Sequence, residues 1–253
     1  MTQQPIQSRP ILYLVGDSLT EYSTKPEGLH SRLLNWMNIK VDIINRGYSG
    51  WNTDLMRLAL EKHFDQSFNL SNSEDYNICV FICLGANDAS SAELPLPRQH
   101  VPLERFGENL KKIIEMLKSG LKCKKLDVLL CTPPPVNTQQ YAEFVKKSYN
   151  MDVLVRSREL VAPYAESVRN IVKESVSDDK FKVHLVDLWT HDWESEECFT
   201  DGLHFNSKGY EIMFESLKQT IKSSVPNFNG DSMPFSHMYW RDYLDYYSKQ
   251  DSQ

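Results

Sequence analysis

The sequence predicts an α/β protein, a three-layer α/β/α sandwich around a central five-stranded parallel sheet. The first observation is that five short apolar, strand-like runs alternate with longer segments of helical periodicity. The second is that no internal repeat or Gly/Ser linker divides the 253 residues, a length that a single α/β domain commonly reaches. Together they predict one layered domain.

The five expected strands are short apolar runs, and most of them stop at glycine or proline. In chain order they cover residues 11–15, 41–45, 78–84, 126–131 and 183–188. Gly16, Gly47 and Gly85 lie at the ends of the first three, and Pro133 follows the fourth closely. Apolar strands without polar alternation are typical of a parallel sheet that helices cover on both faces.

Three amphipathic segments are expected to be helices of the outer layers. They cover residues 103–120, 152–175 and 207–223, and the second contains Pro163, which lacks an N–H and can bend a helix. Helices of this length connect parallel strands through right-handed crossovers. In such folds ligands bind at the carboxyl ends of the strands, so the loops there are the first candidates for a site.

Composition excludes several classes of protein. Lys and Arg number 28 against 34 Asp and Glu, a formal charge of −6 without a long basic run, which argues against a nucleic-acid partner. No apolar stretch approaches the ~20 residues of a membrane span, and the first residues lack the apolar core of a secretion signal. The odd number of cysteines, 5, is typical of reduced thiols. We therefore expect a cytoplasmic protein.

Neither a metal nor an organic cofactor is expected. Cys79, Cys83, Cys123 and Cys131 lack the C-x-x-C spacing and the clustered histidines of a zinc site, so we interpret them as buried thiols. His184 and His191, near the end of the fifth expected strand, are interpreted as structural side chains. The sequence also lacks the glycine patterns of dinucleotide and P-loop sites and the G-x-S-x-G of α/β-hydrolases.

The loop after the first strand reads Gly16-Asp17-Ser18-Leu19 and can present a serine hydroxyl to a cleft. A neutral hydroxyl attacks a carbonyl carbon poorly without a base. Near the end of the chain, Asp201 and His204 are spaced so that they can meet across one turn. The carboxylate can then hold the imidazole in the tautomer that accepts the serine proton. The same loop could alternatively hold a phosphate with its backbone N–H groups.

An oxyanion hole requires donors aimed at the developing negative charge. Asn87 follows the third strand directly, which places its amide at the same sheet edge as Ser18, and Gly50 follows the second strand, where a backbone N–H can approach a ligand. Asp17 and Asp88, next to Ser18 and Asn87, are interpreted as braces of their loops. The sequence thus contains a candidate nucleophile, candidate oxyanion donors, and a candidate base with its carboxylate.

These blocks, in this order, resemble those of the SGNH (GDSL) hydrolases, and within that family the sequence is similar to the isoamyl acetate-hydrolysing esterases of yeasts. The resemblance runs from about Ile11 to Tyr210 and continues to Trp240-Arg241-Asp242. It implies a flavodoxin-like sheet, a Ser18–His204–Asp201 triad and no cofactor. It also implies an oxyanion hole formed by the N–H groups of Ser18 and Gly50 and the Asn87 side chain.

The expected substrate is a small carboxylic ester, and the resemblance favours acetates of medium-chain alcohols such as isoamyl acetate. Candidate pocket walls are apolar residues near the loops: Trp51, Leu94, Leu96, Phe144 and Phe205. A wider pocket would suit a lysophospholipase, a thioesterase or a carbohydrate acetylesterase of the same family. The alternative from another class is a flavodoxin-like module that binds a phosphate or flavin, but such a module has no use for Asp201 and His204.

We divide the chain into a hydrolase domain, residues 1–225, and an extension of it, residues 226–253. The extension is rich in aromatic residues, which disordered tails lack. Either it packs on its own domain, or it reaches across a homodimer near the cleft of the neighbour. Both interpretations stay open at this point.

Overall fold

The sheet consists of five parallel strands in the order β2-β1-β3-β4-β5. The structure is a computed structural model that describes residues 8–68, 73–93, 99–191, 193 and 197–250. The strands are β1 (Ile11–Gly16), β2 (Asp42–Gly47), β3 (Asn77–Cys83), β4 (Lys125–Cys131) and β5 (Phe181–Val186). Each overlaps the run expected from the sequence, which confirms the predicted sheet.

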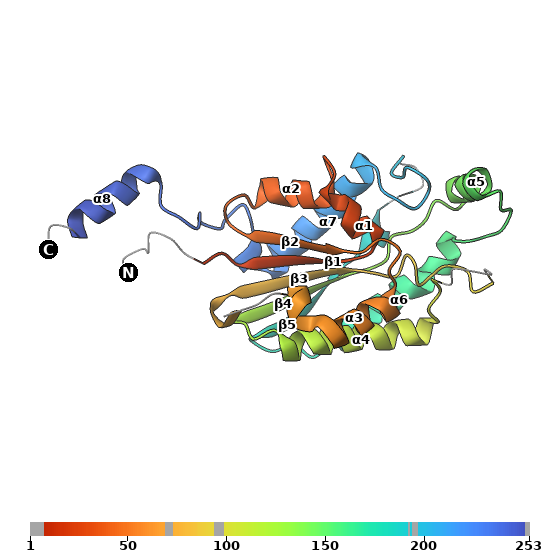
Figure 1. The fold of residues 1–253 in the computed structure, drawn as a ribbon, viewed down its shortest axis with the longest axis horizontal. Helices are drawn as coiled ribbons and strands as arrows, with labels where there is room; N and C mark the ends of the chain where they lie inside the picture. Colours follow the sequence, from red (N-terminus) through yellow and green to blue (C-terminus); the bar gives the residue numbers. More distant parts are fainter. Residues whose placement is uncertain (1–7, 69–72, 94–98, 192, 194–196, 251–253) are drawn as a thin grey trace.

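Helices cover both faces of this sheet (Figure 1). α2 (Leu29–Trp36) and α7 (Ser207–Ser224) lie on one face, and α3 (Thr53–Phe68), α4 (Leu103–Gly120) and α6 (Arg158–Glu174) lie on the other. Two shorter helices, α1 (Ser18–Glu21) and α5 (Thr138–Tyr149), stand at the carboxyl ends of the strands. Short 3₁₀ turns occur at Tyr22–Thr24, Ser73–Asp75, Leu188–Thr190 and Pro226–Phe228. The expected three layers are therefore confirmed.

The three expected helices are present, with one difference in their bounds. The helix expected over 152–175 begins only at Arg158, because the Ser157 side chain caps it by accepting a hydrogen bond from the Leu160 N–H at 3.2 Å. It continues without interruption through Pro163. α3 is kinked at His63, whose backbone angles are not helical (φ −137°, ψ 35°).

The strand register places three loops side by side. Gly16, the last residue of β1, pairs with Gly47 of β2 on one side and with Cys83 of β3 on the other. The loops that follow these residues therefore leave the sheet at the same level. Ser18, Gly50 and Asn87 lie in these three loops, two to four residues beyond the paired positions.

The cysteines and histidines outside this edge have structural surroundings. Cys79, Cys83 and Cys131 are buried free thiols within β3 and β4. Cys123, which was also expected to be buried, is only half-buried, because it lies in the loop before β4 and not within the sheet. His184 Nε2 lies 2.9 Å from an Asp127 carboxylate oxygen, and His191 Nε2 lies 2.9 Å from the Ser216 hydroxyl. Within the described ranges, no group of three or more His, Cys, Asp and Glu side chains is arranged to hold a metal ion. No helix among the described residues has the length and apolar character needed to cross a membrane.

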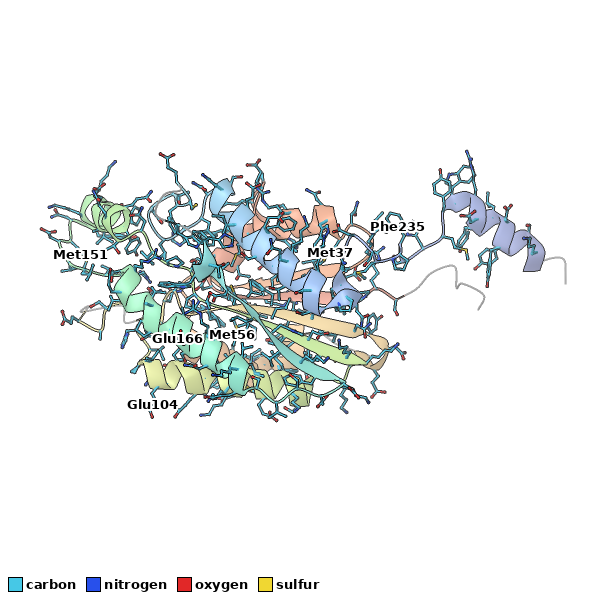
Figure 2. All side chains as sticks on the ribbon, turned by 180° about the vertical axis from the view of Figure 1, so that it is seen from behind. Met37, Met56, Glu104, Met151, Glu166 and Phe235 are labelled. Carbon is cyan, nitrogen blue, oxygen red and sulfur yellow. The ribbon has the colours of Figure 1, made fainter. Side chains whose placement is uncertain are left out.

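The extension after α7 has an anchored part and a projecting part. Phe228 is fully buried, Trp36 Nε1 donates to Asp231 at 2.7 Å, and the Ser236 hydroxyl donates to the Ile39 carbonyl at 2.8 Å. Beyond this anchor the chain leaves the domain and forms α8 (Trp240–Gln250), which projects away from the sandwich (Figure 1). Figure 2 shows Phe235 on the connection between the two.

Candidate active site

Ser18 is placed at the carboxyl edge of the sheet by the short helix that β1 runs into. Asp17 caps this helix by accepting a hydrogen bond from the Leu19 N–H at 3.0 Å, so Ser18 is the first residue of α1. The N–H of a first helical residue has no acceptor within its own helix. The Ser18 N–H and hydroxyl are thus presented at the same edge.

Ser18, His204 and Asp201 form a continuous chain of hydrogen bonds. Ser18 Oγ lies 3.0 Å from His204 Nε2, and His204 Nδ1 lies 2.7 Å from Asp201 Oδ2. Because an ionised carboxylate can only accept hydrogen bonds, Nδ1 carries the ring proton and donates a hydrogen bond to Asp201. In the neutral ring, Nε2 is then the acceptor for the Ser18 hydroxyl. The geometry is that of a serine nucleophile, its base and the carboxylate that orients the base.

Asp201 is held in its charged form by its own turn. Burial raises its pKa, but hydrogen bonds from the His204 ring and from the backbone N–H groups of His204 and Leu203 outweigh burial and bring the pKa below its usual value. The two N–H groups both donate to Oδ1, at 2.8 and 2.9 Å, which leaves Oδ2 for the imidazole. The carboxylate is therefore ionised at neutral pH and fixed in direction.

Gly202 permits the tight turn between Asp201 and His204. Its φ is +91°, and a Cβ at this position would lie 2.4 Å from the Tyr141 nitrogen at the start of α5. Its carbonyl accepts a hydrogen bond from the Asn137 N–H at 2.9 Å. The turn that carries His204 is thus packed directly against α5, where a larger residue than Gly202 does not fit.

Gly50 lies in the loop after β2 with φ +79°, a conformation that favours glycine. This loop is tied to α1, because the Ser49 N–H donates to the Glu21 carboxylate at 2.6 Å and the Ser49 hydroxyl lies 3.1 Å from the Tyr22 hydroxyl. The Tyr22 ring in turn lies 5.5 Å from the His204 ring, between centroids. Gly50 is therefore fixed relative to the serine and the histidine.

Asn87 is buried in the loop after β3, and its amide contacts the loop after β2. One N–H of its Nδ2 donates to the Trp51 carbonyl at 2.8 Å, which leaves the second N–H for another acceptor. Its Oδ1 accepts from Arg156 at 2.8 Å. The two loops that are expected to supply oxyanion donors are thus linked to each other.

Two buried carboxyl groups next to these residues brace the loops, as expected. Burial raises the pKa of Asp17 to about 6, and burial raises the pKa of Asp88 to about 7. Asp88 accepts hydrogen bonds from the backbone N–H and the hydroxyl of Thr53, the first residue of α3. One oxygen of each carboxyl group has no hydrogen-bond partner among the described residues, which suits a protonated group.

The expected pocket residues lie in different surroundings. Trp51 is half-buried and stacks on Tyr48, with 4.3 Å between ring centroids, in the same loop as Gly50. Phe144 is half-buried on α5. Phe205 is buried and stacks on Trp193 at 5.0 Å, within an aromatic cluster of the core. Leu94 and Leu96 lie outside the described residues.

Reasoning from the sequence missed Arg156 and Gln99. The Arg156 guanidinium is buried between the loops and contacts Asn87, and Gln99 donates to the Gly50 carbonyl at 2.9 Å. Arg156 is separated from Asn87 by 69 positions in the chain. No local pattern marks either residue, because only the folded chain brings them to the loops.

Comparison with known proteins identifies the family of the chain. The profile of the GDSL-like lipase/acylhydrolase family matches residues 12–217, which include Ser18, Gly50, Asn87, Asp201 and His204. The chain therefore belongs to the GDSL family. It is 31% identical over 237 residues to the human isoamyl acetate-hydrolyzing esterase 1 homolog, covering 92% of this chain and 88% of that protein. It is 32% identical over 233 residues to a GDSL esterase/lipase of Arabidopsis thaliana, covering 89% and 69% of the two chains.

Solved structures of GDSL-type enzymes share the fold. A lipase/acylhydrolase from Enterococcus faecalis matches with a TM-score of 0.56 and 22% identity, over 85% of this chain and 96% of that one. An acetyl-xylooligosaccharide esterase from a Geobacillus species matches with a TM-score of 0.59 and 19% identity, over 86% and 96%. The protein has the SGNH hydrolase fold, and membership of the GDSL family makes it a carboxylic ester hydrolase.

Proposed function

We propose that this GDSL hydrolase is a serine esterase that cleaves small carboxylic esters, with acetates of medium-chain alcohols such as isoamyl acetate as preferred substrates. The hydrogen-bonded chain from Ser18 through His204 to Asp201 is the observation that carries the mechanism. The acetate preference is supported by the relatives, several of which are named as isoamyl acetate-hydrolyzing esterase homologs.

The first half of the reaction transfers the acyl group to the enzyme. Ser18 Oγ attacks the ester carbonyl carbon while His204 Nε2 takes the hydroxyl proton. The carbonyl oxygen becomes negative and accepts hydrogen bonds from the N–H groups of Ser18 and Gly50 and from Asn87 Nδ2. The intermediate collapses, His204 returns the proton to the alcohol oxygen, and the alcohol leaves an acetylated Ser18.

The second half repeats these steps with water. His204 takes a proton from water as the water oxygen attacks the acyl carbon, and the proton then returns to Ser18 Oγ when the acid leaves. Asp201 stays ionised throughout and stabilises the imidazolium that forms in each half. The low pKa of its carboxyl group is consistent with this role.

We propose that the substrate pocket lies above this edge of the sheet. We place its wall at Trp51 and Phe144, which are half-buried, whereas Phe205 supports it from the core. A pocket lined by aromatic side chains favours an apolar acyl or alcohol group over a charged one.

The test is hydrolysis of isoamyl acetate beside p-nitrophenyl acetate, butyrate and octanoate by the wild-type protein. We expect the acetates to have the highest kcat/KM, because a short acyl pocket excludes longer chains. A preference for octanoate would contradict the acetate-ester proposal and favour the lysophospholipase or thioesterase alternative. A preference for acetylated sugars over isoamyl acetate would favour the carbohydrate acetylesterase alternative.

We also propose a cytoplasmic location and a homodimer. The location is supported by the five free cysteines, since secreted proteins commonly pair theirs. The dimer is supported by the projecting α8, on which Trp240 and Leu244 are 57% and 61% exposed, and by Tyr239 just before it, which is 60% exposed. A helix of 11 residues is marginal alone in water, so a partner surface would stabilise it.

A further inference from the structure

We propose that Arg156 is a positioning residue that fixes the two oxyanion donors lying outside the nucleophile loop, Gly50 and Asn87. This inference rests on the proposed function, because it assigns the residue to the same reaction. Arg156 lies in the segment before α6 and is 5% exposed. It does not contact Ser18, His204 or Asp201 in the described structure.

The guanidinium group donates to four acceptors, and all four are uncharged. Nε donates to the Ala86 carbonyl at 3.1 Å and Nη1 to the Tyr141 hydroxyl at 2.7 Å. Nη2 donates to Asn87 Oδ1 at 2.8 Å and to Gln99 Oε1 at 2.7 Å. Among the described residues no carboxylate accepts a hydrogen bond from Arg156, although its charge opposes the burial that raises the pKa of Asp17. Because a buried cation without a hydrogen-bonded carboxylate is costly, its presence beside the oxyanion site calls for a functional explanation.

Arg156 and the Trp51 carbonyl together determine which way the Asn87 amide points. A guanidinium has only donors, so the amide must turn its oxygen toward Arg156. The amide nitrogen is then directed to the opposite side, where one N–H meets the Trp51 carbonyl and the other is left for the oxyanion. With a neutral donor-and-acceptor side chain in place of Arg156, only the Trp51 carbonyl would oppose the flipped amide, which would present an acceptor to the oxyanion.

The same guanidinium acts on Gly50 through Gln99. Gln99 turns its oxygen to Arg156 and its nitrogen to the Gly50 carbonyl, at 2.7 and 2.9 Å. The Gln99 backbone carbonyl also accepts from Asn52 Nδ2 at 2.9 Å, which adds a second tie to the loop after β2. Arg156 is therefore the common partner of both oxyanion loops, and its charge stabilises negative charge that develops between them.

The decisive experiment is a cycle of Arg156→Gln and Asn87→Ala, measured as kcat and KM on a small ester. Loss of an oxyanion donor lowers kcat by roughly 10²–10³, and we expect Asn87→Ala in that range. We expect Arg156→Gln to lower kcat about tenfold to hundredfold, the scale on which misplacement by about 1 Å acts, with KM within about threefold. In the Asn87→Ala background the same change should have a smaller effect, because the Asn87 branch is already lost and only the Gly50 branch through Gln99 remains. Equal factors in both backgrounds, or a rise in KM at unchanged kcat, would overturn the proposal.

Two further variants separate orientation from charge and from folding. Arg156→Lys keeps the charge, but one ammonium cannot reach both loops, so we expect it to lose most of the activity as well; full activity would overturn the positioning role. The matched control is Arg169→Gln, which removes an arginine of α6 that is paired with Asp187, and this variant should keep kcat within about twofold of the wild type. If the Arg156 variants do not fold, Gln99→Met tests the Gly50 branch alone and should lower kcat at unchanged KM.

A structural measurement distinguishes failure of this inference from failure of the proposed function. A crystal structure of Arg156→Gln should show the Asn87 amide rotated or the Gly50 loop displaced. A structure in which the amide and the loop both keep their wild-type positions would overturn the inference, whatever the activity of the variant. Independently, ester hydrolysis that persists in Ser18→Ala would refute the proposed function and leave the structural result to decide the role of Arg156.

Discussion

Asp88 is a buried carboxyl group whose protonation we expect to change the stability of the fold. Burial raises its pKa to about 7, whereas an unfolded aspartate titrates near 4. The folded protein therefore binds a proton more tightly than the unfolded chain between these values. By linkage, the contribution of Asp88 to the free energy of unfolding falls as the pH rises from about 4 to about 7, and this contribution changes no further above pH 7.

Asp88→Asn tests this directly. The Asn Oδ1 can still accept from Thr53, and its NH₂ replaces the oxygen that has no partner, so the variant mimics the protonated group. Urea unfolding at pH 5 and pH 8 should show the wild type losing about 2–3 kcal/mol relative to the variant, at ~1.4 kcal/mol for each pKa unit. Parallel curves for the two proteins would contradict the assignment. The raised pKa of Asp17 acts in the same direction in both proteins, and the charge of Asp17 is itself one cause of the raised pKa of Asp88.

The turn from Asp201 to His204 is the element in which packing most directly controls the base. Gly202→Ala would place a Cβ 2.4 Å from the Tyr141 nitrogen of α5 at φ +91°. We expect the free energy of unfolding to fall by about 1–3 kcal/mol or more, and kcat to fall because the turn must move His204. Thermal unfolding and ester kinetics measure the two effects.

Gly107→Ala, within helix α4, is the matched control for this prediction. Its new Cβ would meet only the Ser167 hydroxyl, at 3.2 Å, and alanine is favoured over glycine within helices. Activity should therefore be unchanged in this variant. A Gly202→Ala protein with wild-type kcat and stability would contradict the assigned role of the turn.

At the level of elements, apolar runs and turn residues predicted the strands, because β1, β3 and β4 are buried along almost their whole length. The edge strands β2 and β5 are only partly buried. The same logic placed Ser18, Gly50 and Asn87 at one edge, since parallel strands end at the same level. Helix bounds were less predictable: the Ser157 cap, and not the apolar pattern, decides where α6 begins. Arg156 and Gln99 were not predictable, because their partners come from distant segments.

At the scale of the whole molecule, the C-terminal helix α8 projects from the domain and does not pack against its described helices and strands. Residues up to Ser236 are held to the domain, while α8 stands off it (Figure 2). Trp240 and Tyr247 of α8 are exposed, and Tyr243 and Tyr246 are half-buried. Exposed apolar patches of this kind are typical of interaction surfaces. The anchored part matches the interpretation in which the extension packs on its own domain, and the projecting part favours the homodimer.

We expect a chain shortened after Ser236 to be monomeric in gel filtration, because the shortening removes α8 and keeps the anchor. If α8 reaches the neighbour's cleft, kcat/KM for isoamyl acetate falls in parallel. Lys249→Ala, on the same helix, is the control and should leave the dimer intact. A shortened chain that elutes as the wild type does, with equal activity, would contradict the proposed dimer arm.

Ester hydrolysis by Ser18→Ala is the decisive test of the proposal that Ser18 is the nucleophile of an esterase. Wild-type protein and variant are compared on isoamyl acetate, with circular dichroism to show that both are folded. We expect kcat of the variant to be lower by several orders of magnitude, because neither His204 nor the oxyanion donors can replace the attacking oxygen. We also expect an acetyl adduct on Ser18 to be trapped in the wild-type protein and no adduct in the variant. Activity that is unchanged in Ser18→Ala would contradict the proposed nucleophile and the mechanism built on it.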